Sequence, residues 1–226
     1  ENLDDSFHRY IYVSSAGVYK ENYELPLSEN SPLDPNSRHK GKFETENWLL
    51  DQKIPFTSFR PTYIYGPGNY NKIENWFFER LLHNKTIPIP ADGSLITQLG
   101  HVSDLSDAMI KSLDFEKSKN NIYNCSGNKG VTIKGLIYMC AEVCGLNKNE
   151  ISFNKFDFQK LDSKSRKGFP IRLNHYQTDI SKIKNHLNWE PKFDLLSGLR
   201  DSFINDYQLK KDNDFDRNSD SVLFNS

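Results

Sequence analysis

The chain has 226 residues, of which 36% are hydrophobic and 13% aromatic, so it is long enough for one large domain or two small ones with a substantial core. Its formal net charge of −1 excludes the overall basic excess that is typical of proteins held to nucleic acid by phosphate contacts, and any such role needs a local basic patch. Three cysteines are too few for a disulfide framework, and no apolar run reaches the ~18 residues of a membrane span, so we expect a reducing compartment and no membrane partner.

The first elements expected along the chain are a strand, a helix and a second strand. Residues 9–15 hold the run Tyr-Ile-Tyr-Val followed by Ser-Ser, which is typical of a strand that ends in a polar loop. Residues 37–52 predict a helix that Pro55 ends. Residues 56–65 predict a strand that stops at a Gly-Pro-Gly turn.

The second half continues the alternation of helices and strands. The expected elements are an amphipathic helix over 72–84, a helix over 105–114, a strand over 122–126 and a helix over 132–145. Asp104 and Thr132 are placed to cap the two later helices, and Gly145 to end the last. Cys140 and Cys144 are one helical turn apart without further ligands nearby, so we interpret them as packing residues. Such alternation predicts an α/β fold with parallel strands.

Several short motifs follow one another at characteristic positions. They are Ser-Ser-Ala-Gly-Val-Tyr at 14–19, Ser-Arg-His-Lys-Gly-Lys at 37–42, Arg-Pro-Thr-Tyr-Ile-Tyr-Gly-Pro at 60–67, His-Val-Ser-Asp at 101–104, Tyr-Asn-Cys-Ser-Gly at 123–127 and Leu-Asn-Trp-Glu-Pro at 187–191. In this order they resemble the extended short-chain dehydrogenases, the family of NAD-dependent sugar-nucleotide epimerases and dehydratases. The resemblance covers nearly the whole chain.

The resemblance implies a Rossmann-like parallel sheet with a smaller C-terminal substrate-type subdomain. We expect the Rossmann-like part in 1–68 and 96–127, the subdomain in 69–95 and 128–207, and a polar tail that frays over 208–226. The twelve glycines form no Gly-x-Gly-x-x-Gly turn after a strand, so we expect the glycine-rich, phosphate-binding N-terminal half of the fold to be missing.

The family's chemistry, as the resemblance implies it, uses a tyrosine and a lysine four residues apart on one helix face. The lysine lowers the tyrosine pKa and holds the nicotinamide ribose, while a serine at a strand end holds the substrate oxygen. By position, Ser15 and Lys42 match the serine and the lysine, and together with Pro61 they form the expected cofactor-binding set. The tyrosine position holds Arg38.

Arg38 removes the family's proton shuttle, because a guanidinium stays charged and offers no lone pair near neutral pH. Together with Lys42 it is instead suited to hold phosphate. His39 does not replace the tyrosine, since it lies about 100° round the helix axis from the required face. We therefore expect NAD(P) chemistry of the ordinary kind to be lost, although NAD(P) stays a candidate cofactor.

Two further departures concern the substrate. An Arg-Asp pair, whose arginine contacts the nucleotide pyrophosphate in relatives, is replaced by Thr97 and Gln98, and an asparagine before the Gly-Pro turn is replaced by Tyr63.

The strings at 63–71, 74–81 and 98–102 resemble one branch, the chloroplast stem-loop binding proteins and their cyanobacterial relatives. This resemblance implies binding to stem-loop RNA, an endoribonuclease activity that uses a divalent metal such as Mg²⁺ in some members, and association with ribosomes or transcription complexes. It also implies a plastid stroma or a cyanobacterial cytoplasm, and homo- or hetero-oligomers.

Two basic clusters are candidates for RNA binding. The first holds Arg38, His39 and Lys40, and the second holds Lys164, Arg166, Lys167 and Arg172. Each cluster is also consistent with an ordinary exposed surface that binds no RNA. Among the aromatic residues, Tyr70, Trp76 and Phe78 are candidates to stack on unpaired bases, with core packing favoured for Trp76. No carboxylate spacing singles out a metal site, so the sequence names no residues for RNA cleavage.

Three hypotheses remain open. The first is an RNA-binding protein with a degenerate dehydrogenase fold, with or without RNA cleavage. The second is an NAD-dependent sugar-nucleotide epimerase, dehydratase or reductase with an altered proton donor. The third is a scaffold without catalysis.

Overall fold

The computed structural model describes residues 7–21, 24–83, 86–210 and 223. At its centre is a parallel sheet of β1 (Tyr10–Val13), β2 (Phe56–Pro61) and β7 (Asn121–Cys125), in the order β1-β2-β7. All six residues of β2 are buried, because the middle strand of such a sheet has a neighbour on each side and cover on both faces. The predicted α/β class with parallel strands is confirmed.

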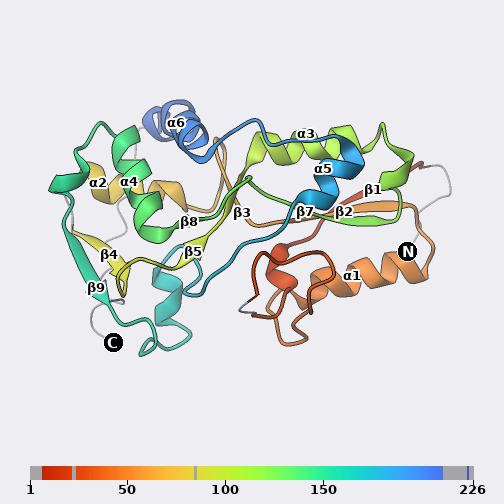
Figure 1. Cartoon of the computed structure of the whole chain (residues 1–226), viewed down its shortest axis with the longest axis horizontal. Helices are drawn as coiled ribbons and strands as arrows, with labels where there is room; N and C mark the ends of the chain where they lie inside the picture. The colour runs from red at the N-terminus through yellow and green to blue at the C-terminus, as the bar shows by residue number, and fades with distance from the viewer. Residues whose placement is uncertain (1–6, 22–23, 84–85, 211–222, 224–226) are drawn as a thin grey trace.

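Helices cover the two faces of this sheet (Figure 1). Helix α1 (Lys40–Asp51) lies on one face, and α3 (Val102–Ser112) with α5 (Ser181–Leu187) lies on the other. Successive β2 side chains point to opposite faces, so Ser58 bonds to Glu46 of α1 while Phe59 packs against Leu105 of α3. Trp189 completes the buried cluster beneath α3 and α5.

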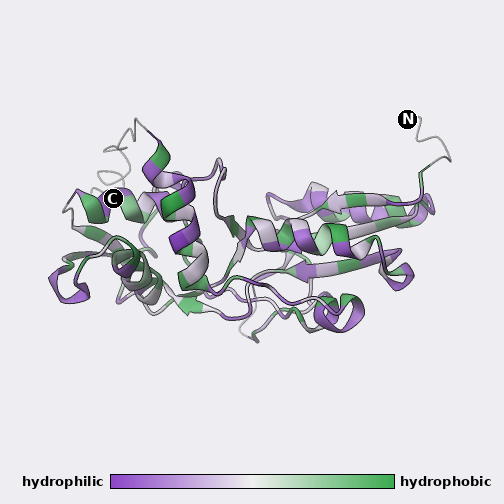
Figure 2. Ribbon diagram, turned by 90° about the horizontal axis from the view of Figure 1, so that it is seen from above, coloured by the Kyte–Doolittle hydropathy of each residue, from purple (hydrophilic) through white to green (hydrophobic). Residues whose placement is uncertain are grey.

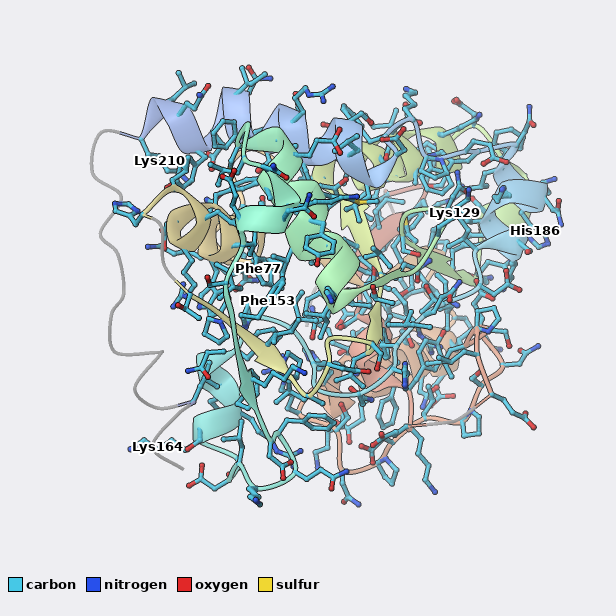
Figure 3. The ribbon with its side chains drawn as sticks, turned by 60° about the vertical axis from the view of Figure 1, so that its left-hand side comes forward. Phe77, Lys129, Phe153, Lys164, His186 and Lys210 are labelled. Carbon is cyan, nitrogen blue, oxygen red and sulfur yellow. The ribbon has the colours of Figure 1, made fainter. Side chains whose placement is uncertain are left out.

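A second group of elements surrounds the largest hydrophobic cluster, at the left of Figure 1. Helices α2 (Glu74–Leu82), α4 (Ile133–Val143) and α6 (Leu195–Asn205) pack together beside β4 (Ile87–Pro90) and β9 (Phe153–Phe156), which pair in parallel. Phe77 of α2 is completely buried and points into this group (Figure 3). Cys140 is buried in the cluster and Cys144 packs against it, as predicted for packing residues.

Two short strand pairs connect the groups. Strand β3 (Tyr63–Tyr65) pairs in parallel with β6 (Leu99–His101), and β5 (Ile96–Thr97) pairs antiparallel with β8 (Val131–Thr132). Five 3-10 turns complete the described elements: η1 (Ala16–Val18), η2 (Glu116–Ser118), η3 (Lys148–Glu150), η4 (Ser165–Gly168) and η5 (Tyr207–Leu209). Polar loops line much of the perimeter, and the outer helices carry both polar and apolar residues (Figure 2).

Three expected boundaries are wrong, each for a local reason. The helix expected from residue 37 begins at Lys40, because the Ser37 hydroxyl accepts from the His39 backbone N–H and holds a turn there. The strand expected over 56–65 is two strands, since the chain leaves β1 and β7 after Pro61 to pair with β6. Helix α3 begins at Val102, with the His101 side chain as its cap.

Asp104 is therefore not the helix cap that its position suggested. Its carboxylate accepts the backbone N–H groups of Lys192 and Phe193 and so ties α3 to the segment before α6. Thr132 does cap α4, accepting from the Gly135 N–H, and Gly145 follows the helix with a φ of 73°.

The predicted tail over 208–226 lies mostly outside the described residues. Leu223, which is described, is buried in the largest hydrophobic cluster, so the tail is not polar and exposed at that position. Within the described residues, no helix is long and apolar enough to cross a bilayer.

Candidate functional site

A cavity of about 870 Å³ lies where four basic side chains meet. Arg38 comes from the turn before α1, Arg166 and Lys167 come from η4, and Arg172 follows η4. Members of the two basic clusters that are more than a hundred residues apart in the sequence therefore line one cavity. We call this cavity the basic cleft.

A second cavity of about 440 Å³ opens beside the basic cleft. It is lined by Ser15, Lys42 and Pro61, the three residues that the family resemblance assigns to the cofactor side. We call it the inner cavity. A third hollow of about 280 Å³ includes Trp76 and Lys167. Three residues line all of these spaces, namely Arg38, Tyr63 and Asn71, so Arg38 stands where they join.

The end of β1 positions the serine of the inner cavity. Ser15 caps the turn η1 directly after the strand, with its Oγ accepting the Gly17 N–H at 3.0 Å. A Cβ on Gly17 would lie 2.4 Å from His39 Cδ2 and 2.7 Å from Arg172 Nη2. Glycine at this position therefore lets a histidine and an arginine from distant segments approach the strand end.

Lys42 lies in the first turn of α1 and points back to the sheet. Its Nζ donates to the Val13 carbonyl at 2.8 Å and lies 5.2 Å from the centre of the Tyr12 ring. This contact holds the ammonium at the end of β1. Lys42 and Ser15 therefore line the same cavity.

Arg38 and His39 precede α1, so the expected 100° offset between them on a helix does not apply. The Arg38 Nε donates to the His39 Nε2 at 3.0 Å, and both side chains line the inner cavity. Burial and the nearby charges of Arg38, Arg172 and Lys42 lower the pKa of His39 to about 4. His39 is therefore a neutral imidazole that accepts a hydrogen bond from a cation at neutral pH.

Tyr63 lies at the wall between the basic cleft and the inner cavity. Its hydroxyl accepts the Arg172 backbone N–H at 2.7 Å. Burial raises the pKa of Tyr63, although Arg172 and Arg38 act in the opposite direction. The phenol that replaces the family's asparagine is thus held in its protonated form and helps to place Arg172.

Arg172 is also held by a ring. Its guanidinium lies 4.6 Å from the centre of the Tyr176 ring, and the Tyr176 hydroxyl donates to the Ala16 carbonyl of η1. Burial raises the pKa of Tyr176, so this hydroxyl also stays protonated. The contacts fix Arg172 from the C-terminal part of the chain against the end of β1.

Thr97 and Gln98, which replace the family's Arg-Asp pair, are each 1% exposed. The Gln98 amide donates to the Gly127 carbonyl at 2.8 Å, and its Oε1 accepts the Thr178 N–H at 2.8 Å. Gln98 is thus a buried brace between chain segments, and neither residue lines the basic cleft.

A buried ion pair links the elements that carry the site residues. The Arg60 Nη2 lies 2.6 Å from the Glu46 Oε2, and the two side chains are 4% and 0% exposed. Ser58 also donates to Glu46, and Arg60 donates to the Tyr19 hydroxyl. This network joins α1, β2 and the segment after η1, so it holds these elements in fixed positions relative to one another.

Some predicted site residues lie elsewhere. Lys40 and Lys164 are exposed and line none of the cavities described here, and Lys164 projects from the edge of the molecule (Figure 3). Phe78 is completely buried against Phe203 and Tyr207, so it is not available to stack on a base.

The other two aromatic candidates differ. Trp76 is 7% exposed and packs in the core as predicted, with the Arg80 guanidinium 3.5 Å from its ring centre. Tyr70 is 91% exposed and lines the inner cavity. The sequence pointed to Tyr70, but it assigned no role to Asn71, which becomes a site residue because it lines all three spaces.

Two hydroxyls of the inner cavity lack partners. Ser14 is 4% exposed, and its Oγ has no hydrogen-bond partner among the described residues; the same holds for the Thr62 Oγ1. Both residues line the inner cavity. Within the part of the chain that the structure describes, no three His, Cys, Asp or Glu side chains gather closely enough to hold a metal ion.

The chain has relatives among proteins of known sequence. The chain is 46% identical over 213 residues to Chloroplast stem-loop binding protein of 41 kDa b of Arabidopsis thaliana, covering 92% of this chain and 55% of that protein. It is 26% identical to a dTDP-glucose 4,6-dehydratase of an Actinoplanes species, covering 86% of this chain and 58% of the relative.

Among solved structures, a UDP-glucuronic acid 4-epimerase from Bacillus cereus in complex with UDP-glucuronic acid and NAD shares the fold. The TM-score is 0.73 at 20% identity, covering 90% of this chain and 62% of that one. The chain thus spans between 55% and 62% of the length of each of these relatives. Residues 3–126 match the model of the NAD dependent epimerase/dehydratase family. The chain therefore belongs to the NAD dependent epimerase/dehydratase family, and its similarity to a chloroplast stem-loop binding protein agrees with the branch that its motifs predicted.

Proposed function

We propose that the protein binds stem-loop RNA, with the RNA phosphates held in the basic cleft. The observation that carries the proposal is the convergence of Arg38, Arg166, Lys167 and Arg172 on one cavity. Arginine offers a planar fork of donors that matches phosphate geometry, and Tyr63 and Tyr176 hold one of these arginines in place. The relative from Arabidopsis, named as a stem-loop binding protein, supports RNA as the source of the phosphates.

The net charge of −1 does not oppose this proposal. Electrostatic binding depends on the local field, and the four cationic side chains that line the basic cleft outnumber its two carboxylates, Glu21 and Asp34. Burial and, after it, the charges of Arg38, Arg172 and Lys42 lower the pKa of His39, so three cations act on one imidazole that lines the inner cavity. A bound phosphate would relieve the repulsion among these cations.

The second candidate function is NAD-dependent sugar-nucleotide chemistry. The residues fit the nicotinamide side of a dinucleotide, because Ser15, Lys42 and Pro61 line one cavity. Bound NAD(P) would supply hydride transfer there. Among the described residues that line this cavity we find no activated proton donor, since Arg38 occupies the tyrosine position and burial raises the pKa of both Tyr63 and Tyr176. We therefore favour RNA binding.

RNA cleavage is a separate property within this proposal. The stem-loop binding branch implies a nuclease that uses a divalent metal, whereas a scaffold would bind RNA without cutting it. Incubating a 5′-labelled stem-loop RNA with the protein, with Mg²⁺ or with EDTA, separates the two. Cleavage that needs Mg²⁺ supports the nuclease, and intact RNA under tight binding supports the scaffold.

The binding proposal is tested by comparing charges inside and outside the basic cleft. We expect Arg38→Ala and Arg172→Ala each to weaken binding of a stem-loop RNA about tenfold, the loss expected for one charge-assisted contact of ~1.5 kcal/mol. Lys40→Ala and Lys164→Ala remove the same charge from exposed sites outside the cavities and should change the affinity less than threefold. Affinity is measured by fluorescence anisotropy at 50 mM salt.

The result that would overturn the proposal is equal affinity across all four variants, or an unmodified protein that shows no binding at low salt. Turnover of a sugar nucleotide with NAD, abolished by Lys42→Ala, would instead support the second candidate.

By analogy with the plastid relative we also propose a plastid location. Association with ribosomes or transcription complexes, and oligomerisation, are further proposals from the same branch.

A further inference from the structure

The third hollow, of about 280 Å³, is continuous with the basic cleft but has its own cation. The residues that line both spaces are Arg38, Tyr63, Asn71, Lys167 and Pro170. Lys72 lines the hollow and belongs to neither the basic cleft nor the inner cavity. No motif assigns a role to Lys72, and the proposed function does not use it.

The charge balance of the hollow is more positive than that of the cleft. Three cationic side chains line it, those of Arg38, Lys72 and Lys167, and none of the described residues around it is acidic. The cleft has four cationic side chains and two carboxylates, Glu21 and Asp34, in about three times the volume. The formal balance is therefore +3 in the hollow against +2 in the cleft. Like charges in so small a space repel one another, and an anion among them offsets that repulsion.

Lys72 is held in place and stays accessible. Its Nζ lies 3.6 Å from the Glu79 Oε1, and 55% of the Lys72 side chain is exposed against 3% of the Glu79 side chain. Glu79 is not part of the lining, so it orients the ammonium without closing the hollow. Even with the charge of Lys72 fully offset by Glu79, Arg38 and Lys167 leave the hollow at +2, which equals the balance of the larger cleft.

The size and the walls of the hollow favour a phosphate group as its ligand. Ile73 and Trp76 are buried and form its apolar side, and such low-dielectric walls concentrate the field of nearby charges. Its volume is just below the usual range of ligand pockets, ~300–1,000 Å³, so it suits a single phosphate group better than a whole cofactor. Arg38 adds the planar fork of donors that matches phosphate oxygens.

We propose that the third hollow binds one backbone phosphate of the RNA through Lys72, Arg38 and Lys167, next along the strand from the phosphates in the basic cleft. This inference rests on the proposed RNA-binding function. It adds to that function a second phosphate site, a binding residue and a path for the backbone. The strand turns at Arg38 and Lys167, which line both spaces, and enters the hollow beside Lys72.

The first test changes the charge at position 72 and measures affinity for a stem-loop RNA by fluorescence anisotropy at 50 mM salt. Lys72→Ala should weaken binding about three- to tenfold, the loss of one charge-assisted contact at a partly exposed site. Lys72→Arg keeps the charge and should bind with nearly the affinity of the unmodified protein. Weakening by Lys72→Ala that is no larger than that by Lys40→Ala, at an exposed site outside the cavities, overturns the inference.

Glu79→Gln separates phosphate binding from a purely structural role of the ion pair. If Lys72 acted only through Glu79, this nearly isosteric change would remove the same pair and weaken RNA binding as much as Lys72→Ala does. If Lys72 binds phosphate, Glu79→Gln releases its charge from the carboxylate, and affinity should be equal or higher. Equal weakening by the two variants overturns the inference. Thermal unfolding shows that each variant is folded.

Lysine acetylation gives a reading that needs no substitution. Sulfo-NHS-acetate modifies accessible amines, and peptide mass spectrometry measures the rate at each lysine. Saturating RNA should slow the acetylation of Lys72 several-fold, while Lys53, which is exposed beyond the far end of α1, keeps its rate. An unchanged rate at Lys72 overturns the inference. If inorganic phosphate protects Lys72 and RNA does not, the hollow takes a free anion and its assignment to RNA is wrong.

Failure of this inference is distinguishable from failure of the proposed function, because Arg172 lines the cleft and not the hollow. If Arg172→Ala weakens RNA binding and Lys72→Ala leaves it unchanged, the cleft binds RNA and only the second phosphate site is wrong. If Arg38→Ala and Arg172→Ala also leave the affinity unchanged, the RNA-binding function itself is wrong.

Discussion

Glu46 and Arg60 are two charged side chains buried next to each other beneath the cleft. Removing one partner leaves the other charge buried without compensation, which costs about 3–5 kcal/mol in comparable pairs. We therefore expect Arg60→Met to lower the free energy of unfolding by about 3–5 kcal/mol in guanidinium titrations. The double variant Glu46→Leu with Arg60→Met should recover most of this loss, and a single variant as stable as the unmodified protein would contradict the account.

His39 gives the site a pH dependence with a definite sign. Its pKa is about 4 in the folded protein, against an ordinary value near 6.5, so the unfolded chain binds more protons between these values. The contribution of His39 to stability is therefore fully present above pH 6.5 and is lost as the pH falls towards 4. Thermal unfolding followed from pH 7 to 4 should show a smaller loss in His39→Gln than in the unmodified protein.

The control for this experiment is His8→Gln, which removes an exposed imidazole. Equal pH profiles for His39→Gln and the unmodified protein would show that the cation field around His39 is weaker than the geometry indicates. Inorganic phosphate should lessen the acid sensitivity of the unmodified protein, because an anion beside Arg38 and Arg172 offsets the repulsion that lowers the His39 pKa.

Individual site residues were predictable where a motif assigns a role to a position. Ser15, Lys42 and Arg38 follow from the spacing of the family pattern, and the structure brings all three to one cavity. Asn71 and Ser14 stand in quoted motifs as well, but those motifs assign no role to either position. Their importance depends on which distant side chains surround them, and a single sequence does not contain that information.

Helix α4 is the element whose ends were best predicted, and its cap allows a direct test. The Thr132 hydroxyl accepts from the Gly135 N–H at 3.0 Å at the start of a helix that lies in the largest core cluster. Losing a side-chain cap typically costs about 1 kcal/mol. Thr132→Ala should lower the free energy of unfolding by about that amount in guanidinium titrations, while Thr132→Ser should keep most of it. Equal stability of the two variants would show that packing alone holds the helix end.

Elements were misplaced where tertiary contacts compete with local signals. The run over 56–65 looks like one strand because its apolar pattern continues, but its pairing partners change after Pro61. Asp104 has the right chemistry and position for a cap, yet its carboxylate binds two distant backbone N–H groups while His101 caps α3. In both cases the competing partner is far away in the sequence.

At the scale of the whole molecule, the class of fold was predictable and the cleft was not. Alternating strands and helices predicted the parallel sheet, since that pattern has few other solutions. The two basic clusters looked like separate solvated faces in the sequence. The path of the chain from η4 to α5 brings Arg172 against the end of β1, and this creates one cationic cavity in a protein of nearly neutral charge.

This gathering of charge predicts a measurable salt dependence. Four cationic side chains line the basic cleft, and each neutralised phosphate contributes about 0.7–0.9 to the slope of log affinity against log salt. We expect a slope of about −3 to −4 for a stem-loop RNA, and a reduction of its magnitude by about 1.5–2 in the double variant Arg38→Ala with Arg172→Ala. Anisotropy titrations at salt concentrations from 50 to 300 mM measure both slopes. Equal slopes would place the RNA contacts outside the cleft.

Thr97 has a consequence for how this protein can change further. It stands where the family resemblance places a ligand-contacting arginine, yet it is 1% exposed and lies next to Gln98, whose amide bonds to the backbone of Gly127 and Thr178. An arginine at 97 would place a charge in this buried position, so restoring a tyrosine at position 38 alone would not rebuild the family's substrate contact. Regaining that contact would first destabilise the fold, because burying a charge costs free energy that a buried threonine does not.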